Sequence, residues 1–405
     1  MKKLLTIALT LIVVFSLVAC SGGAQPIAEE TETPVEATEA PTEATKAPAE
    51  TTESQETVVS GGSLPADLPR YKIALVYASF TDKLGSQMKN AMDYLAEAFN
   101  IEFVYLETGF SADTITVIES SLQTGIDGII MVGASPADLD AAKKAGDVPV
   151  VMIQSEPTTP EVAKEMAAFD NYLGAICEND YEVGYKAVEA LYEAGARNFA
   201  IAGITKGLSK THDDRAQAAI DFINSKSDAK LLADDYSMGL FAEAVTSFAA
   251  SFPEMDGLFA TGGSEGVYQV MRTEGLTGKV KYATIDIQES TGEYFENGDL
   301  AWIAGGQYGT TMVGFAVLYN YIADGTRIIP DTTVTLYRPF LELNNTEEFN
   351  TYVKYVDGEI PVYTVEEVAQ MIHKFNPDAD FAYYQEMAET YSVEDIQTRH
   401  ADLFK

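Results

Sequence analysis

An α/β fold with two similar lobes, each a doubly wound parallel sheet, is predicted by three features of this sequence. Short apolar runs alternate with amphipathic stretches from Tyr71 onward, which is the pattern of strands followed by helices. The alternation occurs as two consecutive sets of similar size, so we expect two lobes with a cleft between them. Of the 405 residues, 46% are hydrophobic, which is enough for the cores of two or three compact units.

The first set begins with the apolar run at 72–77, which is typical of a buried parallel strand. Apolar residues at helical spacing then predict a helix over 84–99. Further strands are expected at 101–106, 128–132 and 148–153, and further helices at 115–122 and 137–145.

The second set begins near Asn179. We expect helices at 181–194, 215–224, 241–252 and 267–273, and strands at 198–202, 231–232, 257–260 and 280–285. Open parallel sheets bind ligands beyond the carboxyl ends of their strands. We therefore expect the binding site directly after Val76, Val132, Ile153, Ala202, Ala260 and Ile285.

Charge and composition exclude several functions. The formal net charge of −36 repels nucleic acid, so no nucleic-acid partner is expected. The two cysteines and three histidines provide neither a disulfide framework nor zinc-ligand spacing. A nucleophile-elbow motif is also missing from the sequence. We expect a protein that is not an enzyme and that uses no cofactor and no metal.

Residues 1–20 have the features of a secretion signal. Two lysines precede an apolar run over 4–18, which is short for a membrane span of roughly 20 apolar residues. An uncleaved N-terminal anchor is the alternative. Residues 17–20 read Leu-Val-Ala-Cys and resemble the lipobox of bacterial lipoproteins, which implies cleavage before Cys20 and lipidation of Cys20. Two acyl chains anchor a protein stably, so the chain is expected on the outer face of the cell membrane.

Residues 21–66 are expected to form a disordered tether, because they alternate Glu, Thr, Pro and Ala and contain no aromatic residue. At the other end, residues 346–405 are expected to form an extension that packs on a lobe. Its expected elements are an extended segment at 359–363 and short helices at 365–375, 381–390 and 396–404.

Eight short motifs follow one another in a recognisable order, namely Ile73–Val76, Thr124–Ile130, Asp147–Val151, Asn179–Gly184, Asp213–Arg215, Phe259–Ala260, Ile285–Asp286 and Gly298–Ala301. In this order they resemble the ribose/galactose-type periplasmic binding proteins, the type I fold that also occurs in the effector domains of LacI-type repressors. The resemblance covers residues 70–340. A repressor is excluded by the secretion signal and by the missing basic DNA-binding headpiece.

The resemblance implies a hinge of three chain crossings, near Glu178, Gln307 and Val334. Lobe 1 would combine residues 67–178 with 308–334, and lobe 2 would combine residues 179–307 with 335–345. The lobes of this family close over a small ligand in a hinge motion.

The implied function is that of a solute-binding lipoprotein, which captures a small organic ligand and delivers it to the permease of an ABC importer. A monomer tethered to the membrane of a Gram-positive cell is the expected form. Three other functions stay open at this point. They are a ligand-sensing subunit for a membrane receptor, a surface adhesion protein without a small-molecule ligand, and an enzyme on the same fold.

The resemblance assigns the main ligand contacts to Arg215, Asp286 and Gln307. Arg215 matches an arginine that forks onto ligand oxygens, and Asp286 matches a carboxylate that accepts ligand hydroxyl hydrogens. Gln307 matches an amide near the second crossing. The alternative for Arg215 is a salt bridge with Asp213 or Asp214, and the alternative for Asp286 is capping of the next helix. We expect Arg215→Ala to weaken ligand binding while changing the melting temperature little.

Further candidates for ligand binding follow other strand ends, namely Ser79, Phe80, Asp82, Gly133, Gln154, Ser155, Gly262 and Gly263. Phe80 could instead belong to the core. Gln154-Ser155 and Gly262-Gly263 stand where family sugar binders often carry Asp-Arg and Asn-Asp. These departures argue against a standard aldopentose or hexose. The expected ligand is therefore sugar-like, nucleoside-like or another small organic molecule.

Overall fold

The computed structural model describes residues 64–404, except for 110–113, 134–135 and 238–240. The expected signal sequence, Cys20 and nearly all of the expected tether therefore lie outside the described residues. Among the described helices, none is both long enough and apolar enough to cross a membrane.

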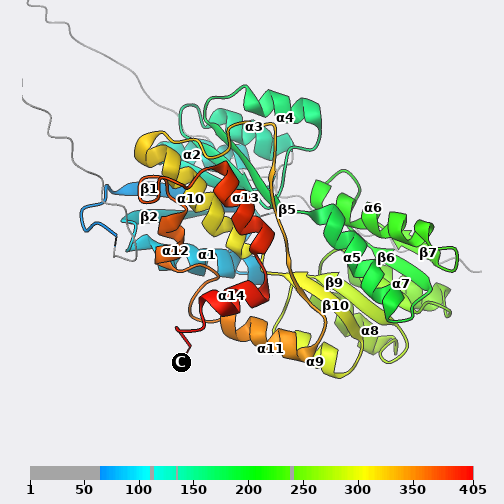
Figure 1. The fold of residues 1–405 in the computed structure, drawn as a ribbon. Coiled ribbons are helices and arrows are strands. Elements are labelled where there is room, and N and C mark those ends of the chain that lie inside the picture. The colour runs from blue at the N-terminus through cyan, green and yellow to red at the C-terminus, as the bar shows by residue number, and fades with distance from the viewer. Residues whose placement is uncertain (1–63, 110–113, 134–135, 238–240, 405) are drawn as a thin grey trace, which may run out of the picture. The chain divides into compact units, whose positions relative to one another are not determined.

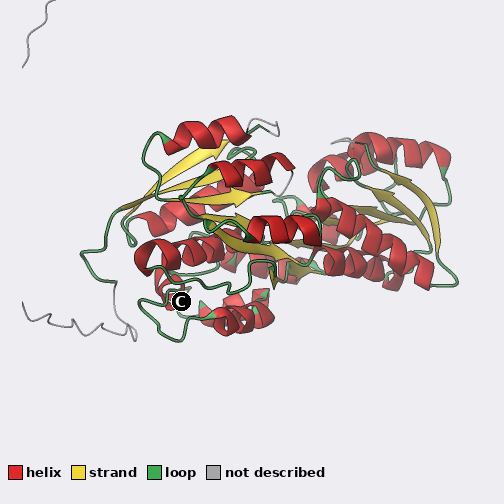
Figure 2. Cartoon of the chain, turned by 90° about the horizontal axis from the view of Figure 1, so that it is seen from above, coloured by secondary structure: helices red, strands yellow, loops and turns green. Residues whose placement is uncertain are grey.

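Two six-stranded sheets define two lobes, and helices flank both sheets (Figures 1 and 2). The strand order is β11-β5-β4-β3-β1-β2 in lobe 1 and β12-β10-β9-β8-β6-β7 in lobe 2. Neighbouring strands are parallel except for β10 and β12. The predicted fold class of two doubly wound lobes is confirmed.

Lobe 1 contains β1 (Tyr71–Tyr77), α1 (Lys83–Ala96), β2 (Ile101–Glu107), α2 (Thr114–Leu122), β3 (Gly128–Val132), α3 (Pro136–Lys144), β4 (Val150–Ile153), α4 (Pro160–Ala167), β5 (Tyr172–Glu178), α10 (Tyr308–Asp324) and β11 (Leu336–Arg338). Lobe 2 contains α5 (Asp180–Glu193), β6 (Asn198–Ala202), α6 (Lys210–Ser225), β7 (Lys230–Asp235), α7 (Phe241–Ser251), β8 (Gly257–Ala260), α8 (Ser264–Thr273), β9 (Lys281–Ile285), α9 (Thr291–Glu296), β10 (Leu300–Gly305) and β12 (Leu341–Leu343).

Burial explains why the apolar runs form strands. In β1 the four residues 73–76 are buried, as a parallel strand covered on both faces requires. The following helix α1 begins where Asp82 caps it, and Met88, Met92 and Leu95 share its buried face. Helix α10 differs, because every residue from Tyr308 to Asn320 is buried. A helix that is buried all round must be covered on its outer side as well as by the sheet.

The chain crosses between the lobes at three places in this part of the fold. The first crossing follows Glu178 at the end of β5, and the second passes through Gln307 between β10 and α10. The third follows Arg338, because β11 still pairs with β5 of lobe 1 and β12 pairs with β10 of lobe 2. The expected position near Val334 was therefore wrong. Val334 lies in an exposed turn before β11, and the chain changes sheets only beyond Arg338.

The C-terminal extension consists of α11 (Thr346–Tyr355), α12 (Val365–Gln370), α13 (Phe381–Thr390) and α14 (Val393–Arg399). The helix predicted at 381–390 is confirmed, whereas α11 was not predicted. The segment 359–363, expected to be extended, instead forms bends. The helix expected at 365–375 begins at Val365 after the Thr364 cap but already ends at Gln370, whereas the one expected at 396–404 begins earlier, at Val393 after the Ser392 cap, and ends at Arg399.

The extension packs on both lobes rather than on one. Helix α11 contacts α9 of lobe 2, whereas α12 contacts α10 and α13 contacts β11 of lobe 1. Figure 1 shows α11 beside α9 and the red helix α13 close to α10. The extension therefore supplies the outer cover of α10.

Candidate interlobe binding site

A cavity of about 200 Å³ lies at the carboxyl ends of β1, β9 and β10. We call it the interlobe cavity, because both lobes, the second crossing and the extension contribute to its wall. The residues that line it are Tyr77, Asp82, Lys83, Leu84, Gln87, Asp286, Ile287, Gln288, Gly306, Gln307 and Tyr352. Three of the candidates from the sequence are thus brought together here, namely Asp82, Asp286 and Gln307.

A chain of hydrogen bonds joins the two lobes beside this cavity. Gln154 of lobe 1 donates from Nε2 to the backbone oxygen of Gln307 at 3.0 Å. Gln307 in turn donates from Nε2 to Oδ1 of Asp286 in lobe 2 at 3.1 Å. The residue at the second crossing therefore contacts both lobes, and its side chain orients the Asp286 carboxylate.

Backbone strain accompanies this arrangement. Gln154 and Asp286 adopt φ angles of +56° and +79°, a region that non-glycine residues seldom occupy. Both residues directly follow a strand end, β4 and β9 respectively. Such strain persists where the surrounding structure holds a side chain in a required position, and it is common at ligand sites.

Asp82 has both a structural and a cavity-facing role. Its Oδ1 accepts a hydrogen bond from Gly85 N at 2.7 Å and so caps α1. Its Oδ2 accepts one from the Tyr77 hydroxyl at 3.2 Å. Burial and the Asp82 charge raise the pKa of Tyr77 far above its ordinary value, so this hydroxyl stays protonated. The cavity thus presents a phenol oxygen and a carboxylate side by side, with the phenol proton donated to Asp82.

The charges around the interlobe cavity favour a ligand that is not an anion. Asp82 and Asp286 line it, and the lining ammonium of Lys83 already pairs with Asp357 at 2.5 Å. His212 adds no positive charge at neutral pH, because burial and then the Arg215 charge lower its pKa to about 3. The site therefore suits a neutral molecule rich in hydroxyl groups, which carboxylates and amides can bind.

Arg215 lies away from the interlobe cavity. Its Nε donates to Oδ1 of Asp180 at 2.8 Å, and its Nη1 donates to the backbone oxygen of Thr261 at 2.8 Å. The side chains of Arg215 and Asp180 are only 6% and 9% exposed. The structure therefore gives Arg215 a buried partner, which is neither of the neighbouring aspartates named as alternatives, Asp213 and Asp214.

The other sequence candidates do not line the cavity. Phe80 packs edge-on against Tyr77 and Tyr105, which fits the core interpretation. Ser79 hydrogen-bonds with Thr81, and Ser155 is half-buried. Gly133 has a φ of +111°, and a Cβ there would lie 2.7 Å from Oδ2 of Asp138.

Gly262 and Gly263 lie next to the cavity residues and leave room for them. A Cβ on Gly262 would lie 3.1 Å from the His212 ring and 3.6 Å from Oδ2 of Asp286. Gly263 has a φ of +69°, and a Cβ there would lie 2.7 Å from the Phe241 ring. Gly262 therefore permits close packing beside Asp286, and Gly263 permits it against Phe241.

Several cavity residues were not predicted from the sequence. Lys83 and Gln87 lie in the first turns of α1, and Gln288 lies two residues beyond Asp286. Their position shortly after strand ends is the signal that marks them, as it marks Asp82 and Asp286. Tyr352 belongs to the extension, and nothing in the sequence pattern marks it.

A second cavity of about 290 Å³ lies around the first crossing. Its lining is strongly acidic, with Glu156, Glu178, Asp180 and Asp214 among its residues. Lys210 crosses from lobe 2 to Oε1 of Glu156 at 3.0 Å, and hydroxyls of Thr335 and Tyr337 also donate to Glu156. These carboxylates are engaged within the protein, so this cavity fits an interlobe contact better than a ligand site.

Glu178 makes this crossing sensitive to pH. Burial raises its pKa to about 7, although the Thr310 hydroxyl donates to it. The pKa of Glu178 is therefore higher in the folded state than the ordinary 4.5 of the unfolded chain. Its stabilising contribution is fully present below pH 4.5 and is lost as the pH rises through about 7. Since one pKa unit is about 1.4 kcal/mol, the loss is on the order of 3 kcal/mol.

We therefore expect Glu178→Gln to flatten the pH dependence of the melting temperature between pH 5 and pH 8. The variant should gain stability relative to the wild type at pH 8 and lose that advantage at pH 5. Thermal unfolding followed by circular dichroism at several pH values measures this difference. Parallel curves for the two proteins would show that Glu178 does not titrate in this range.

Comparisons with known proteins agree with this architecture. The sequence profile described as periplasmic binding protein domain matches residues 73–326. No curated protein matches the chain. Among solved structures, an ABC transporter solute-binding protein from Agrobacterium vitis with bound α-D-tagatopyranose superposes with a TM-score of 0.61 at 17% identity, covering 70% of this chain and 96% of that protein.

Two further solved structures are similar to the same degree. A periplasmic solute-binding protein from Actinobacillus succinogenes with bound D-allose has a TM-score of 0.60 and 19% identity, covering 69% of this chain and 99% of its own. A solute-binding protein from Bacillus halodurans with bound myo-inositol has a TM-score of 0.60 and 15% identity, covering 72% of this chain and 100% of its own. The three relatives share the fold, and in each the match leaves more than a quarter of this chain uncovered.

Proposed function

Because this chain belongs to the periplasmic binding protein domain family, we propose that it captures a small cyclic polyol between its lobes and delivers it to an ABC importer. A monosaccharide or an inositol is the expected class of ligand. Neither Gln154-Ser155 nor Gly262-Gly263 lines the cavity, so their departure from the family pattern does not exclude an aldose. The closed protein would then be the form that the permease recognises.

The observation that carries this proposal is the hydrogen-bond chain from Gln154 through Gln307 to Asp286. It couples both lobes to the residue at the second crossing, directly beside the cavity. A ligand that binds Asp286 and the loop after β1 would contact both lobes at once. Such a ligand stabilises the closed arrangement by its differential affinity for it.

The chemistry of the interlobe cavity supports the ligand class. Carboxylates and amides accept and donate hydrogen bonds to hydroxyl groups, and the absence of an unpaired cation among the described lining residues disfavours phosphates and carboxylates. A volume of about 200 Å³ suits a single ring rather than a longer molecule. The three similar solved structures hold α-D-tagatopyranose, D-allose and myo-inositol.

Isothermal titration of the full chain in detergent with D-tagatose, D-allose and myo-inositol tests the proposal. We expect 1:1 binding of at least one of these probes and no binding of D-glucose 6-phosphate, whose charge the two carboxylates repel. Tight binding of D-glucose 6-phosphate would contradict the proposed ligand class, and so would the absence of a binding heat with all three neutral probes.

The second part of the proposal concerns the membrane. Residues 17–20 support lipidation of Cys20, and the tether that follows would let the lobes reach a permease. We expect Cys20→Ser to leave the chain unprocessed or to shift it from the membrane fraction to the medium. Immunoblots of both fractions, together with the mass of the mature chain, measure this change. Unchanged processing and anchoring in the variant would contradict lipidation at Cys20.

A further inference from the structure

The C-terminal extension forms a fourth connection between the lobes. After β12, helix α11 lies against α9 of lobe 2, where the Phe349 ring covers Gly292 so closely that a Cβ on Gly292 would lie 2.8 Å from Cε1 of Phe349. The chain then returns towards lobe 1. There the Tyr308 hydroxyl at the start of α10 donates to Val356 O and accepts from Val362 N.

The returning chain is firmly fixed on lobe 1. Asn320 of α10 donates from Nδ2 to Met371 O at 2.9 Å and accepts from His373 N at 2.7 Å. Arg338 at the end of β11 donates to the Tyr363 hydroxyl at 2.7 Å. The contacts of Asn320 with Met371 and of Arg338 with Tyr363 are buried, so the extension is part of the folded body rather than a loose tail.

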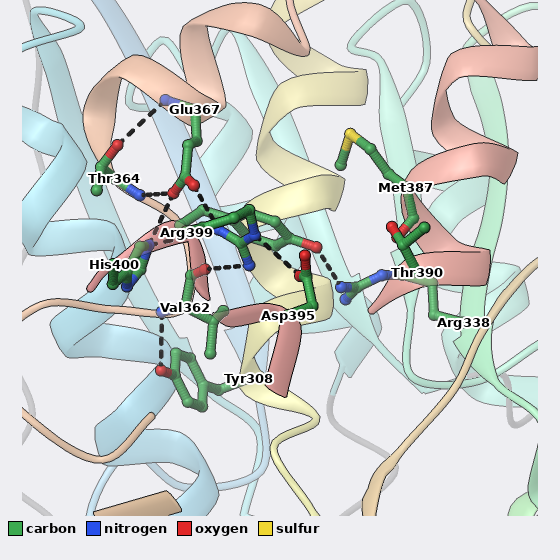
Figure 3. Close-up of polar contacts among 11 residues, drawn as sticks. Tyr308, Arg338, Val362, Thr364, Glu367, Met387, Thr390, Asp395, Arg399 and His400 are labelled. Atoms are coloured by element: carbon green, nitrogen blue, oxygen red, sulfur yellow. Dashed lines mark hydrogen bonds and ion pairs between the residues drawn. The ribbon is translucent and has the colours of Figure 1, made fainter. Parts of the chain in front are cut away.

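A charged network also fixes the extension internally, as Figure 3 shows. Glu367 accepts hydrogen bonds from Thr364 N, Arg399 and His400, and Arg399 also donates to Val362 O. Burial opposes ionisation of Glu367, but these donors and the Arg399 charge prevail and lower its pKa to about 2. These contacts hold helices α12 and α14 together beside α11, the helix that reaches the interlobe cavity.

Two residues of the extension act at the interlobe cavity itself. Tyr352 of α11 lines the cavity and hydrogen-bonds with the Gln87 side chain. Asp357 binds two other lining residues, since Lys83 Nζ lies 2.5 Å from its Oδ2 and Gln87 Nε2 lies 2.8 Å from its Oδ1. The extension therefore both forms part of the wall and positions side chains that α1 contributes.

We propose that the C-terminal extension is a third component of the ligand site, in which Tyr352 is a specificity-determining residue that shapes the cavity wall beside Gln87. The Tyr352 side chain is only 1% exposed, so it supports the wall from behind and fixes the shape of the cavity through Gln87 rather than by presenting an open ring face. Asp357 is a positioning residue, because it neutralises Lys83 and orients Gln87. This inference rests on the proposed function, whose ligand class it uses.

The test is isothermal titration of the full chain in detergent with D-tagatose, D-allose and myo-inositol. Tyr352→Phe removes only the hydroxyl, whereas Tyr352→Leu also removes the ring. We expect Tyr352→Leu to weaken the best-bound probe by about tenfold or more, or to change which probe binds best, and Tyr352→Phe to have a smaller effect in the same direction.

The matched control is Tyr355 on the same helix. It is also buried, but its ring packs against Phe404 and it does not line the interlobe cavity. Tyr355→Leu should lower the melting temperature as Tyr352→Leu does while leaving affinity within about twofold of the wild type. The control thus separates a loss of folding stability from a change in the shape of the cavity.

The outcomes distinguish this inference from the proposed function. If the wild type binds a probe and both Tyr352 variants bind it equally well and with the same preference, the extension is not part of the site, and the proposed function stands. If Tyr355→Leu loses as much affinity as Tyr352→Leu, the effect is one of stability, and the inference is again overturned. If the wild type binds none of the three probes, the proposed ligand class fails and the inference fails with it.

Discussion

Asp286→Asn is expected to weaken ligand binding by about tenfold to a hundredfold while leaving the fold intact. The carboxylate lines the interlobe cavity, and Gln307 holds one of its oxygens. Hydrogen bonds to a charged acceptor contribute about 1.5–3 kcal/mol each, so the loss of the charge has a large effect. Asparagine tolerates the φ of +79° that this position requires, so the backbone should be unchanged.

A matched control for this variant is Asp228→Asn. Asp228 is an exposed carboxylate of lobe 2 that binds Arg197 and Tyr192 outside the cavity. Isothermal titration with the best-bound neutral probe should show unchanged affinity for the control and a marked loss for Asp286→Asn. Equal affinities for the two variants would place the ligand elsewhere.

Arg215→Ala is expected to lower the free energy of unfolding by about 3–5 kcal/mol, the usual result of removing one partner of a buried ion pair. The change leaves the Asp180 carboxylate buried without its guanidinium partner and frees the oxygen of Thr261. The family resemblance alone led us to expect little change in the melting temperature of this variant. The buried ion pair with Asp180 replaces that expectation.

Chemical denaturation of Arg215→Ala, Asp180→Ala and the double variant measures the coupling. Because the two side chains contact each other, the double variant should be less destabilised than the sum of the single variants, by about 1 kcal/mol or more. A variant Arg215→Ala that unfolds like the wild type but binds no ligand would instead support a direct ligand contact.

The sequence pattern was sufficient for the fold class because each lobe follows from local signals. Buried strands such as β1 and β3 are short apolar runs, and helices such as α1 and α5 carry caps and amphipathic faces. The third crossing was misplaced because the chain changes sheets without a helix between β11 and β12. Such a step leaves no change of periodicity in the sequence.

The site was only partly predictable, for a physical reason. Asp82, Asp286 and Gln307 follow strand ends, and parallel strands bring those ends together. Arg215 lies within α6, the helix after β6, and whether its side chain enters the cavity or a buried ion pair depends on packing between α5 and α6. Tyr352 and Asp357 could not be predicted, because their contacts join helices far apart in the sequence.

A crystal structure of the full chain with its best-bound neutral probe would locate the ligand. We expect one ligand molecule in the interlobe cavity, within hydrogen-bond distance of the Asp286 carboxylate, and in contact with the loop after β1 on the opposite lobe. A ligand bound instead in the acidic cavity beside Glu156 and Asp180, with the interlobe cavity unchanged, would contradict this expectation.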